Sequence, residues 1–263
     1  MFLSIILPAY NEEKRLLISM EQLRKQLTSI LTNIAEVLGD EVDVFEIIIV
    51  NDGSTDQTSS IVRAYINNFP DFDLKLIELS QNQGKGYAVK MGVEAARGKY
   101  IAFMDADLST PPTELPKLIT AIQKDCAIAI GSRGLPQSEI IEHQPLYREL
   151  MGKAFNTLVR LLVINGIHDT QCGFKVFRTH EAKQIFRLLQ TARFGFDVEI
   201  LVIAQELGIP IREIPITWYN SAHSSVSPFR DSWEMFYSLL AMKRQVRRNI
   251  LTNSLEKSIL HGN

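Results

Sequence analysis

The sequence predicts an α/β fold in which a mostly parallel, Rossmann-like sheet carries helices on both faces. The first observation behind this prediction is that short β-rich runs alternate with segments of helical periodicity through the first hundred residues. This is the pattern of parallel strands joined by right-handed crossover helices. The second is the composition, 46% hydrophobic and 22% charged over 263 residues. It is typical of a globular chain long enough for one large domain or two small ones.

The expected elements follow one another in order along the chain. Strands are expected at residues 3–10, 45–54, 73–80 and 100–107. Helices are expected from Glu12 to about Leu38, over 55–69 with Thr55 or Asp56 as N-cap, over 84–98 with Gly98 closing the helix, and from near Pro112. Polar segments follow three of these strands, and open parallel sheets bind ligands at the carboxyl ends of their strands. We therefore expect a site at that edge.

Charge and cysteine content narrow the partners and the compartment. The net charge of −2 gives no general attraction to nucleic acid. Residues 1–132 hold 12 Lys and Arg against 18 Asp and Glu, whereas residues 133–193 hold 9 against 5, so the two parts are expected to do different work. The two cysteines form no CxxC pair, which favours a reducing compartment. With no basic leader and no apolar run of about 20 residues, we expect a cytoplasmic protein that contacts membranes only peripherally.

The segment "MDADLSTPP" ends the fourth expected strand with two carboxylates one residue apart, Asp105 and Asp107. Like charges this close repel each other unless a cation lies between them. Carboxylate oxygens suit Mg²⁺ or Mn²⁺, which commonly bridge one or two carboxylates to a diphosphate. The alternative is a simple turn in which one aspartate caps the helix that begins near Pro112.

Two further loops allow a structural and a functional interpretation. In "VNDGSTDQT", Gly53 and the following hydroxyls are typical of a strand-to-helix turn, while Asp52 could accept hydrogen bonds from a nucleotide base or ribose. In "NQGKGYAV", Lys85 precedes a helix on a glycine-flanked turn and could meet a phosphate or be a solvated surface cation. The dinucleotide pattern GxGxxG is not completed, because Val89 stands at its last position.

Six segments in order carry a resemblance to a known family: "LPAYNEE", "VNDGSTDQT", "NQGKGYAVKMG", "MDADLSTPP", "GSR" and "DTQCGFKVF". Together they resemble the family-2 inverting glycosyltransferases of the GT-A fold, over roughly residues 2–220. The set is most similar to the dolichyl- and polyprenyl-phosphate glycosyltransferases, and "DTQCGFK" with "RFGFDVEIL" points to their glucosyl branch.

This resemblance implies roles for particular residues. Those implied to line the nucleotide pocket are Pro8, Ala9, Tyr10 and Glu12, with Asp52 at the base. The segment Asp105-Ala106-Asp107 is implied to hold the donor and a divalent cation between its two carboxylates. Arg133 and Arg148 fall at acceptor-phosphate positions, and Lys175 is a further basic candidate. Asp169 is the first choice for a residue that orients the acceptor or acts as base; alternatively, it pairs with one of the arginines.

Two amphipathic helices are expected in the basic part of the chain. Their apolar stripes consist of Phe155, Leu158, Val159 and Leu162 in the first and of Met235, Leu239, Met242 and Val246 in the second. Such a pattern fits an interfacial helix on anionic lipid, or a helix packed on the protein's own core. We expect a catalytic domain over 1–227, with an acceptor- and membrane-facing region at about 133–193, and a basic amphipathic helix and tail over 228–263.

The leading hypothesis is a metal-dependent inverting enzyme that transfers glucose from UDP-glucose to a polyprenyl or dolichyl phosphate at the cytoplasmic face of a membrane. The second hypothesis keeps the chemistry and replaces the donor by GDP-mannose. The third is a non-catalytic nucleotide-sugar-binding membrane scaffold, for which the paired aspartates and the arginines would have no use.

Overall fold

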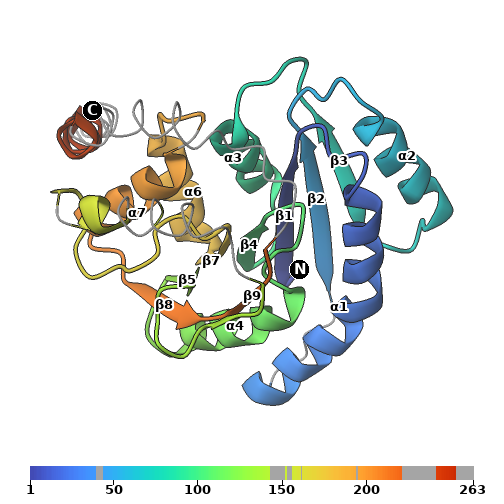
Figure 1. The fold of residues 1–263 in the computed structure, drawn as a ribbon, viewed down its shortest axis with the longest axis horizontal. Helices are drawn as coiled ribbons and strands as arrows, with labels where there is room; N and C mark the ends of the chain where they lie inside the picture. Colours follow the sequence, from blue (N-terminus) through green and yellow to red (C-terminus); the bar gives the residue numbers. More distant parts are fainter. Residues whose placement is uncertain are drawn as a thin grey trace, which may run out of the picture.

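The computed structural model describes residues 1–39, 44–142, 152, 156–160, 162–193, 195–220 and 241–252. Its centre is a seven-stranded sheet in the order β3-β2-β1-β4-β7-β5-β8 (Figure 1). The strands are β1 (Leu3–Ala9), β2 (Phe45–Asn51), β3 (Leu74–Glu78), β4 (Tyr100–Met104), β5 (Ile128–Ser132), β7 (Phe174–Arg178) and β8 (Ile211–Pro215). A second, two-stranded sheet joins β6 (Glu139–Ile140) to β9 (Thr217–Trp218).

Six of the seven strands have a parallel neighbour, as predicted. The strands β3, β2, β1 and β4 are parallel, and β5 is parallel to β8. In contrast, β7 runs antiparallel to both β4 and β5. β7 therefore begins at the edge of the sheet at which β4 and β5 end. The predicted mostly parallel α/β sheet is thus confirmed.

Helices cover both faces of the sheet, as predicted. They are α1 (Leu16–Leu38), α2 (Thr58–Asn68), α3 (Lys85–Ala95), α4 (Leu115–Lys124), α6 (Thr179–Leu188) and α7 (Phe196–Glu206), with a short 3-10 turn, η1 (Pro112–Glu114), before α4. One hydrophobic cluster packs α1, α2 and α4 against one face, and a second packs α3, α6 and α7 against the other.

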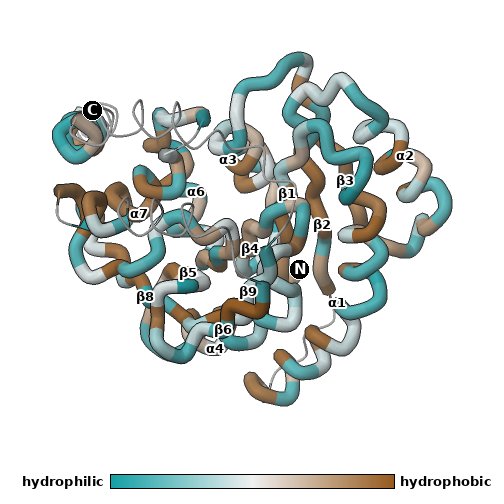
Figure 2. The backbone as a smooth tube through the Cα atoms, in the orientation of Figure 1, coloured by the Kyte–Doolittle hydropathy of each residue, from teal (hydrophilic) through white to brown (hydrophobic). Residues whose placement is uncertain are grey.

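Burial on both faces explains the continuous apolar runs of the central strands. In β1, Ile5 belongs to the first cluster and Ile6 to the second, and both are fully buried. Successive side chains of a strand point to opposite faces, so every position of such a strand must be apolar or have a buried polar partner. Figure 2 shows the result as brown strands in the interior and teal on the outer loops.

Three helix boundaries differ from the sequence-based expectation. The second helix begins at Thr58, and its N-cap is Gln57 rather than Thr55 or Asp56. The other two differences have a tertiary cause. The first helix begins at Leu16 rather than at Glu12, because residues 11–13 use their backbone N–H groups to bind the neighbouring loop. The third ends at Ala95 rather than at Gly98. Beyond it, Ala96 is already extended, and the backbone N–H of Gly98 donates to the Ser4 hydroxyl at 2.8 Å. In both cases, tertiary hydrogen bonds override local helical pattern.

Three residues of the apolar stripes expected in the basic part of the chain face the protein's own core. Residues 241–252 are helical, and Met242 and Val246 are 4% and 2% exposed. Both belong to the second hydrophobic cluster together with Val159, which is fully buried, while Leu162 is exposed. The membrane-facing interpretation is therefore wrong for the three buried residues. Phe155, Met235 and Leu239 lie outside the described residues, as does the domain boundary at 227/228. Among the helices that the structure describes, none is long and apolar enough to span a bilayer.

Candidate active site

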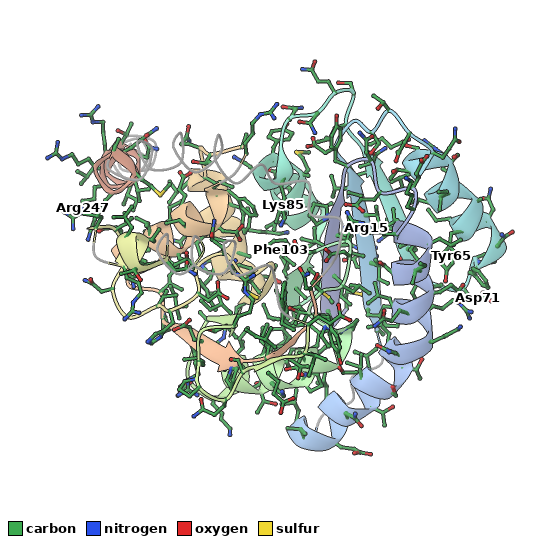
Figure 3. The ribbon with its side chains drawn as sticks, viewed as in Figure 1. Arg15, Tyr65, Asp71, Lys85, Phe103 and Arg247 are labelled. Carbon is green, nitrogen blue, oxygen red and sulfur yellow. The ribbon has the colours of Figure 1, made fainter. Side chains whose placement is uncertain are left out.

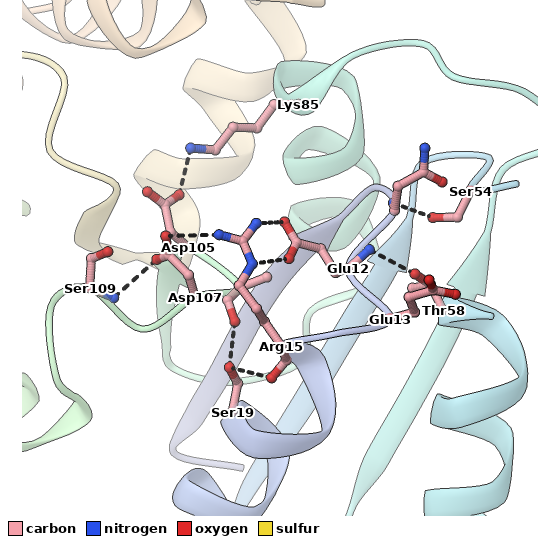
Figure 4. A network of polar contacts seen from close by, with 12 residues as sticks. Glu12, Glu13, Arg15, Ser19, Ser54, Thr58, Lys85, Asp105, Asp107 and Ser109 are labelled. Atoms are coloured by element: carbon pink, nitrogen blue, oxygen red, sulfur yellow. Dashed lines mark hydrogen bonds and ion pairs between the residues drawn. The ribbon is translucent and has the colours of Figure 1, made fainter. Parts of the chain in front are cut away.

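The loop after β1 is bound to the loop after β2 by hydrogen bonds that fix both at the carboxyl edge of the sheet. Three consecutive backbone N–H groups, of residues 11–13, donate to side chains of the second loop at 2.9, 2.8 and 3.1 Å, namely to Ser54, Thr58 and Asp56. The Asn11 side chain accepts from the Thr55 N–H at 2.9 Å, which stabilises the left-handed backbone of Asn11 (φ 55°). The two loops therefore form one surface (Figure 4).

Asp52 joins this surface to the loop that precedes α3. Asp52 is only 3% exposed. Its carboxylate accepts hydrogen bonds from the backbone N–H groups of Gln83 and Gly84, both at 2.8 Å, and from the side-chain amide of Asn82 at 3.0 Å. Gly53 beside it has φ +65°, and a Cβ there would lie 2.4 Å from the backbone of Gln81, so only glycine fits. The structural interpretation of this loop is confirmed; contact of Asp52 with a nucleotide base stays a prediction.

The first aspartate of the pair, Asp105, directly follows β4. Its backbone N–H donates to the Gly173 carbonyl at 3.0 Å, and its carboxylate lies against the bare Cα of Gly173, where an added Cβ would meet Oδ2 at 2.1 Å. The Lys85 ammonium lies 2.5 Å from Oδ1. This buried oxygen nevertheless has no partner of acceptable hydrogen-bond geometry. This carboxylate oxygen therefore has the Lys85 cation beside it at ion-pair distance, without a well-aligned hydrogen bond.

The second aspartate, Asp107, faces a different cation. One oxygen accepts from the Ser109 N–H at 3.0 Å, the hydrogen bond of a local turn, and the other lies 3.8 Å from the Arg15 guanidinium. Arg15 is held in a two-pronged ion pair with Glu12, at 2.7 and 2.8 Å. Burial is the main cause that keeps the pKa of Glu12 above its ordinary value; Arg15 opposes this shift, and the Asp107 carboxylate adds to it.

These residues fit a divalent cation of the Mg²⁺ type. Such ions need few protein carboxylates because water and substrate phosphates complete their coordination. Within the described part of the chain, no cluster of three or more His, Cys, Asp and Glu side chains could hold a metal alone, so a high-affinity all-protein site is not what these residues build. Asp105 and Asp107 would supply two hard oxygen ligands to such an ion.

The predicted acceptor residues Arg133 and Asp169 form a buried ion pair. The Arg133 guanidinium donates to both oxygens of Asp169, at 2.7 and 3.0 Å, and its backbone N–H donates to the same carboxylate. Although burial opposes it, this pairing holds the pKa of Asp169 below its ordinary value. Arg133 also stacks over Trp218, 5.5 Å from the ring centroid. Of the two interpretations of Asp169, the ion pair is what the structure contains; Arg148 lies outside the described residues.

The sequence makes Lys175 a basic candidate for the acceptor phosphate, but the structure buries it inside the protein. Its side chain is fully buried in β7, and its ammonium donates to the Cys172 carbonyl at 2.6 Å and to Asp197 at 2.5 Å. It cannot reach an acceptor phosphate. Instead it fixes the loop that presents Asp169 and Gly173. The apolar surroundings also raise the pKa of the Cys172 thiol to about 12, so this cysteine is a poor nucleophile.

The residues expected in the nucleotide pocket differ in how far their side chains are exposed to solvent. Pro8 and Ala9 are buried within β1, whereas Tyr10, just beyond the strand, is 45% exposed. Ala106 is 5% exposed, and its carbonyl accepts the Ser19 hydroxyl at 2.6 Å. Only Tyr10 of these four therefore presents its side chain to a ligand; the others support the backbone around it.

Sequence reasoning missed Arg15 and Gly173 as members of the site. Arg15 carried one signal, its place three residues after Glu12, since residues at this spacing can pair in a helical turn. Gly173 carried none, because its contact with Asp105 joins segments 68 positions apart and exists only in the folded sheet.

Comparison with known proteins identifies the family of this chain. The family model described as "Glycosyl transferase family 2" matches residues 4–186. Curated dolichyl-phosphate beta-glucosyltransferases of Dictyostelium discoideum and Homo sapiens are 37% and 36% identical over 247 residues, which is 92% of this chain and 74% of each relative. The one of Saccharomyces cerevisiae is 36% identical over 259 residues.

The solved structures that resemble this chain share its fold at low sequence identity. Glucosyl-3-phosphoglycerate synthase from Mycobacterium tuberculosis, in complex with UDP, superimposes with a TM-score of 0.59 at 19% identity, covering 93% of this chain and 80% of that one. TarS of S. aureus, in complex with UDP-GlcNAc, gives 0.56 at 20% identity, covering 92% and 66%. The GT-A architecture and the family resemblance predicted from the sequence are both confirmed: this chain belongs to glycosyltransferase family 2.

Proposed function

We propose that this chain transfers glucose from UDP-glucose to a dolichyl or other polyprenyl phosphate, with inversion at the anomeric carbon. The observation that carries the proposal is the pair Asp105 and Asp107 at the carboxyl edge of the sheet, where each carboxylate has a protein cation beside it. The curated relatives, named dolichyl-phosphate beta-glucosyltransferases, support the choice of glucose and of a lipid phosphate.

The donor half of the reaction belongs to the acidic edge of the sheet. Asp105 and Asp107 would hold Mg²⁺ or Mn²⁺, which would supply positive charge to stabilise the departing diphosphate. Glucosyl-3-phosphoglycerate synthase from Mycobacterium tuberculosis, a solved structure of the same fold in complex with Mn²⁺ and UDP, supports such a cation. Tyr10 offers an exposed ring to the nucleotide. Arg15 lies 3.8 Å from Asp107 and supplies a positive charge beside this carboxylate.

The acceptor half depends on cations more than on a base. A phosphate monoester has a second pKa of about 6, so it reaches the site already as a nucleophilic anion. Arg133 is 29% exposed at its side chain and oriented by both oxygens of Asp169, which makes it a preorganised ligand for that anion. Asp169 acts in this proposal as a positioning residue for Arg133, and Arg148 is the second candidate cation.

The lipid acceptor also places the enzyme at a membrane surface, on its cytoplasmic side in this proposal. The helix over 241–252 has its apolar side against the core, and exposed Arg244 and Arg248 on the outside. Basic side chains on an outward face are attracted to anionic headgroups. The contact proposed here is therefore electrostatic and peripheral.

A transfer assay tests the proposal directly. Purified protein is incubated with a short polyprenyl phosphate, Mg²⁺ or Mn²⁺ and radiolabelled UDP-glucose or GDP-mannose, and lipid-extractable label is counted. We expect label from UDP-glucose, abolished by EDTA. Label from GDP-mannose instead would support the same mechanism with a different donor. If neither donor labelled the lipid, the proposal that a polyprenyl phosphate is the acceptor would be contradicted.

The variant Asp107→Asn tests the metal ligand. Because an amide oxygen is a weaker ligand than a carboxylate, we expect transfer to fall at least about 100-fold with the fold unchanged. Asp71→Asn is the matched control, since Asp71 is exposed and far from the site (Figure 3). Full transfer by a well-folded Asp107→Asn protein would remove Asp107 from the mechanism.

A further inference from the structure

Lys85 has an unexpected neighbour for a residue on a glycine-flanked turn. It is the first residue of α3, and its side chain is 33% exposed. The Lys85 side chain points inward rather than into solvent. Its ammonium lies 2.5 Å from Asp105 Oδ1 (Figure 4) and 5.3 Å from the Phe103 ring centroid. A lysine thus occupies the side of Asp105 where a divalent cation is proposed to bind.

Each carboxylate of the Asp105 and Asp107 pair has a basic side chain close to it. For Asp105 this is Lys85, whose ammonium lies 2.5 Å from Oδ1. Arg15 stands in a similar relation to the second aspartate, 3.8 Å from Asp107. The pair of carboxylates therefore has a protein cation beside each member, which reduces the repulsion between them.

The backbone of Lys85 is fixed, so only its side chain can change partner. Gly84 before it is bound by Asp52, and Gly86 after it packs so tightly that a Cβ would lie 2.7 Å from Phe196 Cβ. The next N–H, of Tyr87, donates to the Ala192 carbonyl at 3.1 Å. The four-carbon stem of lysine has several rotatable bonds, and these give the ammonium its range of movement.

We propose that Lys85 is an internal counter-cation of Asp105 that leaves this carboxylate when a divalent cation binds, and then binds the phosphates of the nucleotide sugar. An ammonium and a divalent cation cannot share one oxygen at such distances, because they repel each other. This inference rests on the proposed function. It adds that Lys85 opposes metal binding in the free protein and supports it once a diphosphate is present, so that metal and nucleotide bind cooperatively.

Binding of Mn²⁺, followed by the EPR signal of the free ion, tests the exchange without any turnover. In the absence of nucleotide, Lys85→Gln is expected to bind Mn²⁺ about five- to tenfold more tightly than the wild type. Addition of UDP should tighten Mn²⁺ binding strongly in the wild type and only weakly in Lys85→Gln. Lys85→Arg keeps the charge and should resemble the wild type.

Lys90→Gln is the matched control for loss of one positive charge from α3. Lys90 lies on the same helix and its ammonium donates to the Leu189 carbonyl at 3.4 Å, away from Asp105. We expect its Mn²⁺ affinity, with and without UDP, to equal that of the wild type. Equal Mn²⁺ affinity of Lys85→Gln and Lys90→Gln, or weaker binding by Lys85→Gln, would overturn the proposal.

The transfer assay on the same preparations separates this inference from the function it rests on. Wild-type transfer of glucose together with an unchanged Mn²⁺ affinity of Lys85→Gln overturns the role of Lys85 alone. If wild-type protein gives no lipid label but Lys85→Gln still binds Mn²⁺ more tightly, the proposed acceptor or donor fails and the counter-cation role stands. A wild type and a Lys85→Gln protein that both fail to bind Mn²⁺, with or without UDP, overturn both.

Discussion

At the scale of single residues, the site depends on a glycine as much as on its carboxylates. Because Gly173 has no side chain, the Asp105 carboxylate can lie directly against its backbone. Lys175 holds the preceding residue in place by donating to the Cys172 carbonyl. The backbone dihedrals of Gly173 are not in the left-handed region, so alanine is compatible with the local conformation. What alanine cannot avoid is the side chain of Asp105.

Gly173→Ala is therefore expected to displace Asp105 while leaving the chain folded. The new Cβ would lie 2.1 Å from Oδ2 and 2.3 Å from Cγ of Asp105, far inside van der Waals contact, and the aspartate must rotate away. We expect Mn²⁺ binding and glucose transfer each to fall by about tenfold or more, with a loss of unfolding free energy of about 1–3 kcal/mol. Transfer rates, Mn²⁺ titration and urea unfolding measure the three quantities.

Gly152→Ala is the control for this substitution, because a Cβ at Gly152 meets nothing within 4 Å. It should leave transfer and Mn²⁺ binding unchanged. If Gly173→Ala also retained both, the close packing of Asp105 would have no part in the site.

The residues of the site divide into those that sequence can predict and those that it cannot. Asp105 and Asp107 could be predicted because their spacing and their place after a strand already carry the chemistry. The contacts of Lys85 with Asp105, and of Arg133 with Asp169, join loops far apart in the chain. Several cations and acids offered plausible partners, and only packing of the sheet decides which of them meet.

At the scale of elements, the opposite edge of the sheet is held by one buried carboxylate at the start of β2. Glu46 is fully buried and accepts hydrogen bonds from β1, β3 and the turn after α3: from Ser4 at 2.7 Å, from Lys75 at 2.6 Å, and from the Arg97 N–H at 2.8 Å. Burial alone would raise the pKa of Glu46, but these partners lower it to about 2. The negatively charged Glu46 carboxylate thus links β1, β3 and the turn after α3.

Glu46→Gln is expected to destabilise the protein at neutral pH and not at low pH. Because the folded pKa lies below the unfolded value of 4.5, the contribution of Glu46 is fully present above pH 4.5 and is lost as the pH falls toward 2. A shift of this size corresponds to on the order of 3 kcal/mol. Urea unfolding of both proteins at several pH values between 7 and 3 measures the difference, which should shrink toward the acidic end.

Glu36→Gln serves as the control, because Glu36 is exposed on α1. Its unfolding free energy should differ from that of the wild type by less than about 0.5 kcal/mol at every pH. A difference between Glu46→Gln and wild type that stays constant from pH 7 to 3 would mean that packing, and not charge, accounts for the role of Glu46.

The elements themselves could be predicted better than their ends and directions. Alternation of apolar runs and helical periods identified β1 to β4 and the helices between them, since each depends on local pattern. The antiparallel insertion of β7 could not be predicted in this way, because strand direction depends on the path of the long connection before it. The small β6–β9 sheet, two residues per strand, is too short for any period to show.

At the scale of the whole molecule, the basic helix near the end of the sequence lies far from the first two helices. The helix over 241–252 lies at one end of the molecule, beside α7, and α1 and α2 lie at the other (Figure 1). Met242 and Val246 pack one side of this helix into the second hydrophobic cluster. Arg247, labelled in Figure 3, pairs with Glu206 of α7 at 2.7 Å on the surface. Arg244 and Arg248 are exposed there.

The double variant Arg244→Gln/Arg248→Gln is expected to weaken binding to anionic vesicles without affecting the fold. Each basic side chain near an anionic surface contributes about 1 kcal/mol, so the pair should change the partition coefficient roughly ten- to thirtyfold at low salt, and much less as screening increases. Co-sedimentation with vesicles containing phosphatidylserine measures this. The matched control is Lys25→Gln/Arg63→Gln, which removes two exposed cations from α1 and α2 at the other end of the molecule. Equal loss in both variants would mean that only net charge matters. No loss in the first would place the membrane contact on another surface.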